Sequence, residues 1–212
     1  MSDAGEYVDD VINQMATRSS RSASHTNPRK AFPMSTPPAG NYVIDLSHTH
    51  AGFAVKHFGL SKVKGEFTEV EGSVVIADEP TASTVTATIN TASFNSRDEG
   101  RDAHVKSADF LDVENFPTIT FSSNSVKADG DDWIVSGDLT IKGVTRNVEL
   151  ATEFEGAITD PYGFQRIAFS AETEIDRTDF GLDFNAALET GGLVVGKKVK
   201  INLEVEAIIP QG

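Results

Sequence analysis

Residues 42–72 read YVIDLSHTHAGFAVKHFGLSKVKGEFTEVEG, and this stretch decides the fold class that the sequence predicts. From Phe53 onward the side chains alternate with the period of two by which a strand buries one face. A glycine interrupts the alternation, which resumes at Val63 and changes phase before Val70. One inserted residue, a β-bulge, would produce this phase change and bend the strand. Long, bent hairpins of this kind suit a closed barrel better than a flat sheet.

The composition excludes several kinds of site and partner. A chain of 212 residues is long enough for one β-domain with a tail. It contains no cysteine, which excludes disulfides, thiolate metal sites and cysteine nucleophiles. Its net charge of −14 makes it an acidic protein that nucleic-acid phosphates and anionic lipid headgroups would repel. We therefore predict no nucleic-acid partner.

Residues 1–40 differ in composition from the rest of the chain. They are rich in Ser, Thr, Pro and basic residues, too polar to bury a core, and predict a disordered tail. Apolar residues at helical spacing from Tyr7 to Met15 indicate one short helix, either transient or a docking element. Met34, just before the domain, is an alternative start of the protein.

The beginning of the chain also bears on the compartment. A secretory signal needs a continuous apolar stretch of about 7 to 15 residues after a basic start, and none is found. We expect a cytoplasmic protein without stable membrane insertion. The four acidic and four basic residues of 1–40 cancel, so the whole net charge belongs to residues 41–212.

Residues 41–210 form the domain that we predict, and they alternate in short segments separated by turn signals. Val85, Ala87 and Ile89 face one way and the threonines between them the other, as in a strand with one buried side. Turn signals stand at ADGDD (128–132), at KG (142–143) and at DPYG (160–163). The segments predict about eight strands, most of them joined by short turns.

One helical excursion interrupts the strands near residues 96–111. Ser96, with Glu99 three residues later, resembles a capping box at its start. Its interleaved charges indicate a solvated face, and it ends in the apolar pair Phe110 and Leu111. This region and residues 176–192 either flank the end of a cavity, because long excursions often carry function, or are ordinary surface connections.

The strand pattern favours a barrel over a sandwich, which is the other all-β arrangement that it allows. The outward faces are polar, so no second layer is needed, and the inward file mixes phenylalanines with small residues. We predict an eight-stranded antiparallel barrel, wide enough to be filled by side chains or to hold one small ligand. Thirteen phenylalanines against one tryptophan supply apolar wall with few polar groups, which suits a long hydrocarbon.

Four segments of the domain resemble the YceI family of polyisoprenoid-binding proteins, and they occur in the family's order. They are IDLSHTHAGFAVKHFGLSKVKGEF (44–67), SRDEGRDAHVKSADFLDVENFPTITF (96–121), GDLTIKGVTRNVEL (137–150) and FSAETEIDRTDFGL (169–182). The resemblance covers nearly all of residues 42–207. It implies an extended, lipocalin-like barrel whose channel holds a long isoprenoid, such as a polyprenyl or quinone tail. Many family members are exported through a signal peptide, and this chain departs from that pattern.

The resemblance also implies which residues line the channel. Carried over residue by residue, the lining consists of inward strand positions and one loop residue: Phe53, Val55, Phe67, Ile89, Phe121, Leu139, Ile141, Phe154, Phe169 and Phe180. Each could equally belong to a packed core, because small barrels commonly fill their interior with side chains. Ligand contact is therefore predicted for the group rather than for any single member.

Histidines near the start of the domain raise the question of a metal site. His48 and His50 are two residues apart and would share a strand face, which is the spacing of a metal pair, and His57 could complete the site. Simple hydrogen bonding of His50 and His57 at the barrel end is the better explanation. No further motif accompanies them, so we predict no metal.

Two short groups raise the question of catalysis. Asp45, Ser47 and His48 contain the residue types of a catalytic triad, but triads are recognised by spatial geometry, and no nucleophile elbow surrounds the serine. DRTDF (176–180) is better interpreted as a turn held by an Arg–Asp pair. We predict no catalytic residue and no enzymatic activity.

Three functions remain open from the sequence. The first is binding, with sequestration or transport, of a long-chain isoprenoid lipid, at about 0.8 kcal/mol for each buried methylene and without a cofactor. The second is an enzyme that acts on such a lipid with a metal or an acid–base pair. The third is a solid barrel that acts in a stress response or binds a partner. An isologous homodimer is the default oligomer.

Overall fold

The computed structural model describes residues 36–186 and 194–210. The predicted tail helix lies outside the described residues. The described part contains eleven strand segments, four 3-10 turns and one α-helix. In chain order these are β1 (Gly40–Ile44), η1 (Leu46–His48), β2 (His50–His57), β3 (Ser61–Phe67), β4 (Val70–Ile76), η2 (Pro80–Ala82), β5 (Thr84–Asn90), η3 (Thr91–Ser93), β6 (Phe94–Asn95), α2 (Glu99–Lys106), β7 (Thr118–Asp129), β8 (Asp132–Ile141), β9 (Val144–Thr159), β10 (Gln165–Asp176), η4 (Arg177–Phe180) and β11 (Val195–Ile208).

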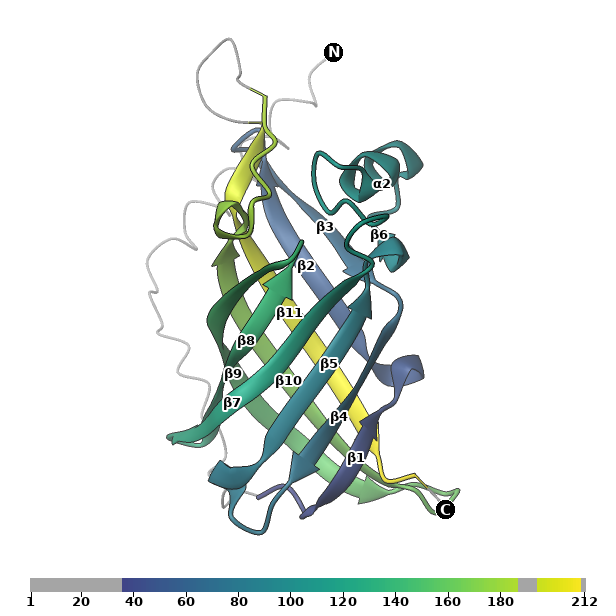
Figure 1. Cartoon of the computed structure of the whole chain (residues 1–212). Coiled ribbons are helices and arrows are strands. Elements are labelled where there is room, and N and C mark those ends of the chain that lie inside the picture. The colour runs from purple at the N-terminus through teal and green to yellow at the C-terminus, as the bar shows by residue number, and fades with distance from the viewer. Residues whose placement is uncertain (1–35, 187–193, 211–212) are drawn as a thin grey trace, which may run out of the picture. The chain divides into compact units, whose positions relative to one another are not determined.

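The sheet closes on itself as an antiparallel barrel, which confirms the predicted fold class. Its hydrogen-bonded order runs β1-β4-β5-β7-β8-β9-β10-β11, and β11 pairs again with β1 to complete a ring of eight. The segments β2, β3 and β6 continue the sheet beyond β11. Figure 1 shows an elongated barrel with α2 at one end and β1 near the other.

The extra segments arise because the first strands are bent and interrupted. β1 pairs with β11 near Ala207, and β2 pairs with β11 from Glu204 back towards Val195. The two strands therefore lie end to end along the same neighbouring strand. Likewise β3 pairs with β2 while β4 pairs with β1. The opening stretch is therefore one long, bent hairpin, as predicted.

The predicted β-bulge in this hairpin is not found. The register between β2 and β3 is continuous, and the phase change falls at Thr68 and Glu69, which lie between β3 and β4. Here the backbone N–H groups of both residues bond to Ser93, to its carbonyl oxygen at 3.3 Å and its Oγ at 3.1 Å. The strand is interrupted because these two N–H groups bond to η3 instead of a neighbouring strand, although the Glu69 carbonyl still accepts a hydrogen bond from the Asn90 N–H of β5 at 3.0 Å.

The turns agree with the sequence signals. The β7–β8 turn contains Gly130 with φ 64°, and the β8–β9 turn places Lys142 and Gly143 in the left-handed region. In the β9–β10 turn, the Asp160 carboxylate accepts hydrogen bonds from the N–H groups of Tyr162 and Phe164 at 2.9 and 3.0 Å. Local chemistry determines these three reversals.

The predicted helix is present but begins differently from the expectation. Asp98 is the N-cap of α2, and its side chain accepts a hydrogen bond from the Arg101 N–H at 2.8 Å. Ser96 lies outside the cap and bonds to the Asp102 carboxylate. The capping box was wrong because Asp98 is itself a strong cap and precedes the helix directly. No helix within 36–186 and 194–210 is both long and apolar enough to cross a membrane.

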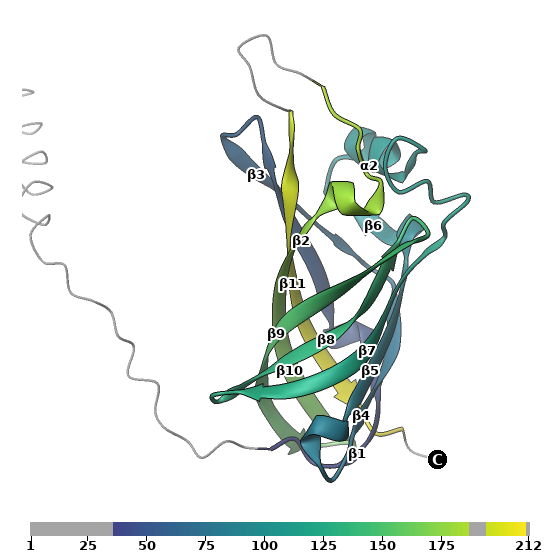
Figure 2. The same cartoon turned by 60° about the vertical axis from the view of Figure 1, so that its left-hand side comes forward.

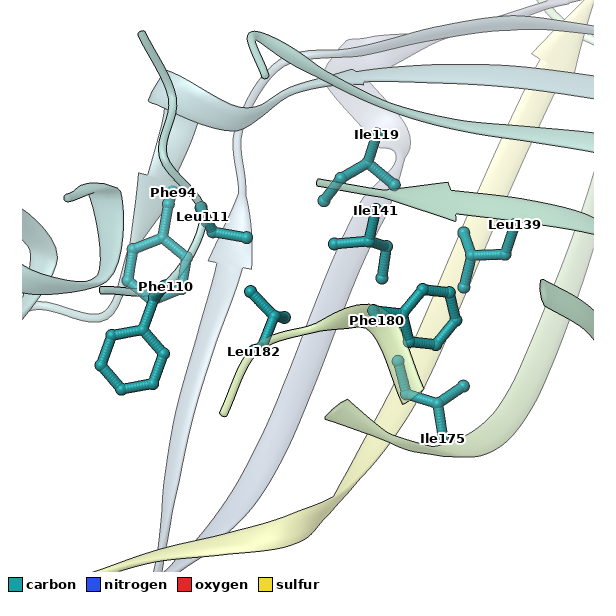
Figure 3. Close-up of a cluster of buried hydrophobic side chains, with 9 residues drawn as sticks. All are labelled: Phe94, Phe110, Leu111, Ile119, Leu139, Ile141, Ile175, Phe180 and Leu182. Carbon is teal, nitrogen blue, oxygen red and sulfur yellow. The ribbon is translucent and has the colours of Figure 1, made fainter. Parts of the chain in front are cut away.

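Three apolar clusters fill parts of the barrel. The α2-end cluster, drawn in Figure 3, joins residues of the strands to η4 and to the loops after α2 and η4. It consists of Phe94, Phe110, Leu111, Ile119, Leu139, Ile141, Ile175, Phe180 and Leu182. The Tyr42 cluster contains the fully buried Tyr42 and Ile167, and the Trp133 cluster contains Val126, Trp133 and Val135. The clusters leave part of the interior unfilled.

An apolar cavity as the candidate functional site

The interior of the barrel contains a cavity of about 660 Å³. Its size lies within the range of about 300–1,000 Å³ that is usual for ligand pockets. Every barrel strand contributes, and the period of two is visible in the lining: β5 presents Val85, Ala87 and Ile89, and β11 presents alternate residues from Val199 to Val205. The alternation that makes these segments half-buried strands therefore also makes the cavity wall aliphatic and aromatic.

Most of the predicted channel residues lie on this wall. The following line the cavity: Phe53, Val55, Phe67, Ile89, Phe121, Leu139 and Ile141. These seven residues lie on the cavity wall, and their contact with a ligand remains a prediction. The α2 region and the segment after η4 also contribute, with Phe110, Leu111 and Leu182.

Three predicted channel residues lie elsewhere. Phe154 and Phe169 pack against the Tyr42 cluster with ring centroids 5.2 Å apart, and neither lines the cavity. Phe180 belongs to the α2-end cluster and is 2% exposed, also outside the lining. Phe154 and Phe169 lie in the packed region around Tyr42. Phe180 is a residue of η4 that belongs to the same cluster as the cavity-lining Leu139 and Ile141.

The predicted channel lining did not include the β11 part of the cavity wall. Ile201, Leu203 and Val205 line the cavity. They show the same alternation that identified the other strands, so the signal was present in the sequence. What was missing was a reason to choose them over Phe154 and Phe169.

Two glycines allow phenylalanine rings to lie flat against the wall. A Cβ on Gly65 would stand 2.6 Å from the Phe53 ring and 2.8 Å from the Asn95 carbonyl oxygen. A Cβ on Gly137 would stand 2.5 Å from the Phe121 ring. Strand glycines often mark such close approaches. Because these positions have no side chain, the rings cover the neighbouring strand rather than standing out into the cavity.

Arg177 holds the α2 end of the cavity together. Its guanidinium is 4% exposed and donates hydrogen bonds to four backbone carbonyl groups, those of Leu182, Phe184, Val195 and Gly196. Burial lowers the pKa of the guanidinium, and nearby carboxylates partly offset this effect. The predicted Arg–Asp pair in DRTDF is wrong, because the arginine bonds to carbonyl oxygens. The Asp176 carboxylate instead accepts hydrogen bonds from the N–H and the hydroxyl of Thr178.

Aromatic side chains pack against one another at the same end of the cavity. The His104 ring of α2 lies 5.2 Å from Phe110 and 4.8 Å from Phe184, and its Nε2 is 3.0 Å from an Asp109 oxygen. Arg177 lies over the Phe110 ring at 5.9 Å. The α2 region, η4 and the start of β11 are thus joined by aromatic packing and by hydrogen bonds to one arginine. The first long excursion and the described part of the second, residues 176–186, both contribute to the cavity wall.

The histidines near the start of the domain do not form a metal pair. His48 ends η1 and its Nδ1 is 3.0 Å from Asp45, whereas His50 begins β2 and its Nδ1 is 2.9 Å from Glu66. The expected shared strand face is wrong because His48 belongs to the 3-10 turn η1, and only His50 lies in a strand. The His57 ring packs on Phe58 at 3.9 Å.

One group in the described part of the chain has metal-ligating atoms close together, Asp45, His48 and Glu206, within 4.8 Å of one another. Arg166 occupies the same place, since it donates to Asp45 at 2.6 Å and to Glu206 at 3.3 Å. It also bonds to Asp160 at 2.7 Å. Hydrogen bonds from Ser47 and Arg166 lower the pKa of Asp45. A guanidinium already neutralises these carboxylates, so we assign the group a structural role.

The Asp45, Ser47 and His48 group also lacks the geometry of a triad. Ser47 Oγ and Asp45 Oδ2 both lie 3.0 Å from the same histidine nitrogen, Nδ1. A triad needs the serine on one ring nitrogen and the carboxylate on the other, so that the ring can transfer a proton between them. The three residues form a local turn that is stabilised by hydrogen bonds to the Asp45 carboxylate.

An apolar cavity within a closed eight-stranded antiparallel barrel defines the class of all-β barrels that have room for one small apolar ligand. The model of the YceI-like domain matches residues 42–207. The chain therefore belongs to the YceI-like domain family, as the resemblance of its motifs indicated.

Individual relatives agree with this assignment. A UPF0312 protein of Staphylococcus aureus is 38% identical over 176 residues, which cover 81% of this chain and 99% of that protein. The protein YceI of Escherichia coli is 39% identical over 162 residues, covering 74% of this chain and 85% of its own length.

Solved structures show the same fold. The Campylobacter jejuni YCEI protein matches with a TM-score of 0.63 at 28% identity, covering 74% of this chain and 90% of that one. BcnA of Burkholderia cenocepacia matches with a TM-score of 0.68 at 22% identity, over 77% of this chain and 98% of that one. A polyisoprenoid binding domain from Saccharophagus degradans matches at 0.60 and 16% identity, over 80% of this chain and 98% of that one.

Proposed function

We propose that this protein binds a long-chain isoprenoid lipid of the polyprenyl or isoprenoid quinone type in its barrel cavity, and sequesters or transports it. The cavity of about 660 Å³ with a nearly continuous aliphatic and aromatic wall is the observation that carries the proposal. Each methylene that enters such a wall contributes about 0.8 kcal/mol. The polyisoprenoid binding domain among the structural relatives supports the choice of lipid.

The two other functions have less support. A solid barrel would need a filled interior, and the cavity argues against it. An enzyme would need a reactive group at the cavity, but the triad-like group has the wrong geometry and Arg166 blocks the acidic cluster. We propose a binding protein without catalytic activity. The homodimer remains a prediction that sedimentation analysis would test. The cytoplasmic location remains a prediction that cell fractionation would test.

The test is mass spectrometry of organic extracts from the purified, undenatured protein. An unrelated protein purified from the same host is the control for carry-over. We expect one dominant long-chain isoprenoid at close to one molecule per chain. A clean extract, obtained again after incubation with prenyl lipids, would contradict the proposal.

A pair of variants ties the lipid to the cavity. Ala87→Phe adds a ring to the cavity wall on β5, whereas Thr86→Phe adds the same ring to the exposed face of that strand. We expect Ala87→Phe to lose most of the lipid and Thr86→Phe to retain it. Equal retention by both variants would place the lipid elsewhere on the protein.

A further inference from the structure

The turn between β2 and β3 exposes apolar side chains that the barrel does not use. Leu60 is 90% exposed and Phe58 is 45% exposed. The Leu60 N–H donates to the His57 carbonyl at 3.1 Å, and both Phe58 and Gly59 adopt left-handed conformations. A phenylalanine with positive φ is uncommon, because the conformation strains a bulky residue. The turn thus holds an apolar tip outward at a conformational cost.

Lysines surround this tip. Lys56 on β2 and Lys62 on β3 are exposed and directly opposite one another in the ladder, and Lys64 is exposed on the same strand. Like charges directly opposite destabilise a strand pair. Lys197 is also exposed, on the neighbouring β11. Within residues 36–186 and 194–210, none of these four lysines has a carboxylate oxygen within 4.0 Å, although Lys197 is near enough to Asp176 to help lower the pKa of that carboxyl.

The positive charge of these four lysines is opposite in sign to the net charge of the whole protein. The chain carries a net charge of −14, from which the sequence predicted repulsion by anionic headgroups. At physiological salt, however, charges further apart than about 8 Å are largely screened. A surface that touches the tip therefore experiences the nearby lysines more strongly than the distant carboxylates.

The tip is at the α2 end of the cavity. Val55, His57 and Val63, which flank the turn, line the cavity, as does Val195 of β11. The Phe58 N–H is bonded to the Val194 carbonyl at 2.9 Å, which anchors the turn to the start of β11. Figures 1 and 2 both show the β2–β3 hairpin at the same end of the barrel as α2 and apart from it.

We propose that the β2–β3 turn, with Phe58 and Leu60 at its tip and Lys56, Lys62, Lys64 and Lys197 around it, docks the protein on an anionic membrane surface. The apolar tip enters the headgroup region, as in interfacial anchors, and the lysines contact anionic headgroups. Docking brings the α2 end of the cavity to the lipid. The inference rests on the tip and its charges, and it holds whichever lipid fills the cavity.

The test is co-sedimentation of the full chain with vesicles of phosphatidylcholine containing phosphatidylserine, against phosphatidylcholine alone. We expect binding to the anionic vesicles that weakens as salt is raised. Lys56→Gln with Lys62→Gln should weaken it by about 25-fold, because each lysine near such a surface contributes about fivefold. Lys127→Gln with Arg146→Gln removes the same charge elsewhere on the barrel and should leave binding unchanged.

A second pair of variants tests the apolar tip. Phe58→Ser with Leu60→Ser should reduce vesicle binding at least tenfold. Ile158→Ser with Tyr162→Ser, which removes side chains 65% and 82% exposed near the β9–β10 turn, should not. Thermal unfolding confirms that each variant is folded.

The outcomes separate this inference from the proposed function. Tip variants should retain the extractable lipid, and Ala87→Phe should still bind vesicles. Wild-type protein that ignores anionic vesicles at low salt would overturn the docking proposal. So would tip or lysine variants that bind as well as wild type, or a tip that mediates only self-association in sedimentation experiments.

Discussion

Hydroxyl groups placed on the cavity wall should weaken lipid binding without changing the shape of the cavity. Val148 on β9 and Val199 on β11 both line the cavity. Val148→Thr and Val199→Thr nearly conserve side-chain volume, so steric exclusion is avoided. In the empty protein water can hydrate the hydroxyls, and a bound hydrocarbon chain would remove that water.

The expected size of the effect follows from the cost of covering a hydroxyl. Covering one without a hydrogen-bond partner costs about 1–3 kcal/mol in proteins. The two positions are separated by β10, so their effects should be roughly additive. At the low end the double variant loses about 2 kcal/mol of binding free energy, which is about 30-fold in Kd.

A matched control separates binding from stability. Val126 and Val135 face each other across β7 and β8 in the Trp133 cluster, are 9% and 7% exposed, and do not line the cavity. Val126→Thr with Val135→Thr should lower the free energy of unfolding, as followed by Trp133 fluorescence in urea. It should leave lipid affinity unchanged.

The assay is displacement of a fluorescent apolar probe by geranylgeraniol, with wild type and both double variants compared at a temperature where all are folded. An unchanged affinity in the cavity variant would refute the assignment of this wall as the binding surface. Equal losses in the cavity variant and its control would show that the hydroxyls act through folding rather than through contact.

Three further predictions concern the framework of the site. Gly65→Val should destabilise the fold by about 1–3 kcal/mol in urea unfolding, because its Cβ would collide with the Phe53 ring and a backbone carbonyl. Arg177→Met should cost more than about 3 kcal/mol and expose the loop after η4 to limited proteolysis, since it leaves four carbonyl groups without their donor. Asp45→Asn should lower the melting temperature at neutral pH, and the difference from wild type should shrink below about pH 4. The reason is that hydrogen bonds lower the pKa of Asp45 in the folded state, so its stabilisation is present above the unfolded pKa and is lost as the pH falls. A difference that stays constant down to pH 2 would contradict the last prediction.

Short-range patterns determined the strands and turns of this protein. Alternation assigned Val85, Ala87 and Ile89 to one face, and all three line the cavity. The turns at Gly130, at Lys142 and at Asp160 follow from residues that tolerate or stabilise a reversal. Because these preferences lie within a few neighbouring residues, the sequence was sufficient to predict them and, with the strand count, the barrel.

Only the tertiary structure decided which inward residues face the cavity and which fill the core. Alternation assigns a side chain to a face but not to a height along the barrel axis, and that height depends on pairing between distant strands. Phe121 and Phe169 follow the same inward pattern, yet the first lines the cavity and the second packs against the Tyr42 cluster.

Long-range pairing also decided the partners of the charged groups. Arg177 was expected to pair with an aspartate of its own turn, but it bonds to the carbonyl groups of Leu182, Phe184, Val195 and Gly196. Arg166 joins Asp45, which lies 121 residues away in the chain. The sequence by itself thus determined the face of each strand and the place of each turn, because local geometry controls both. The cavity, its packed ends and its ion pairs required the closed sheet, because only closure brings residues distant in the chain into contact.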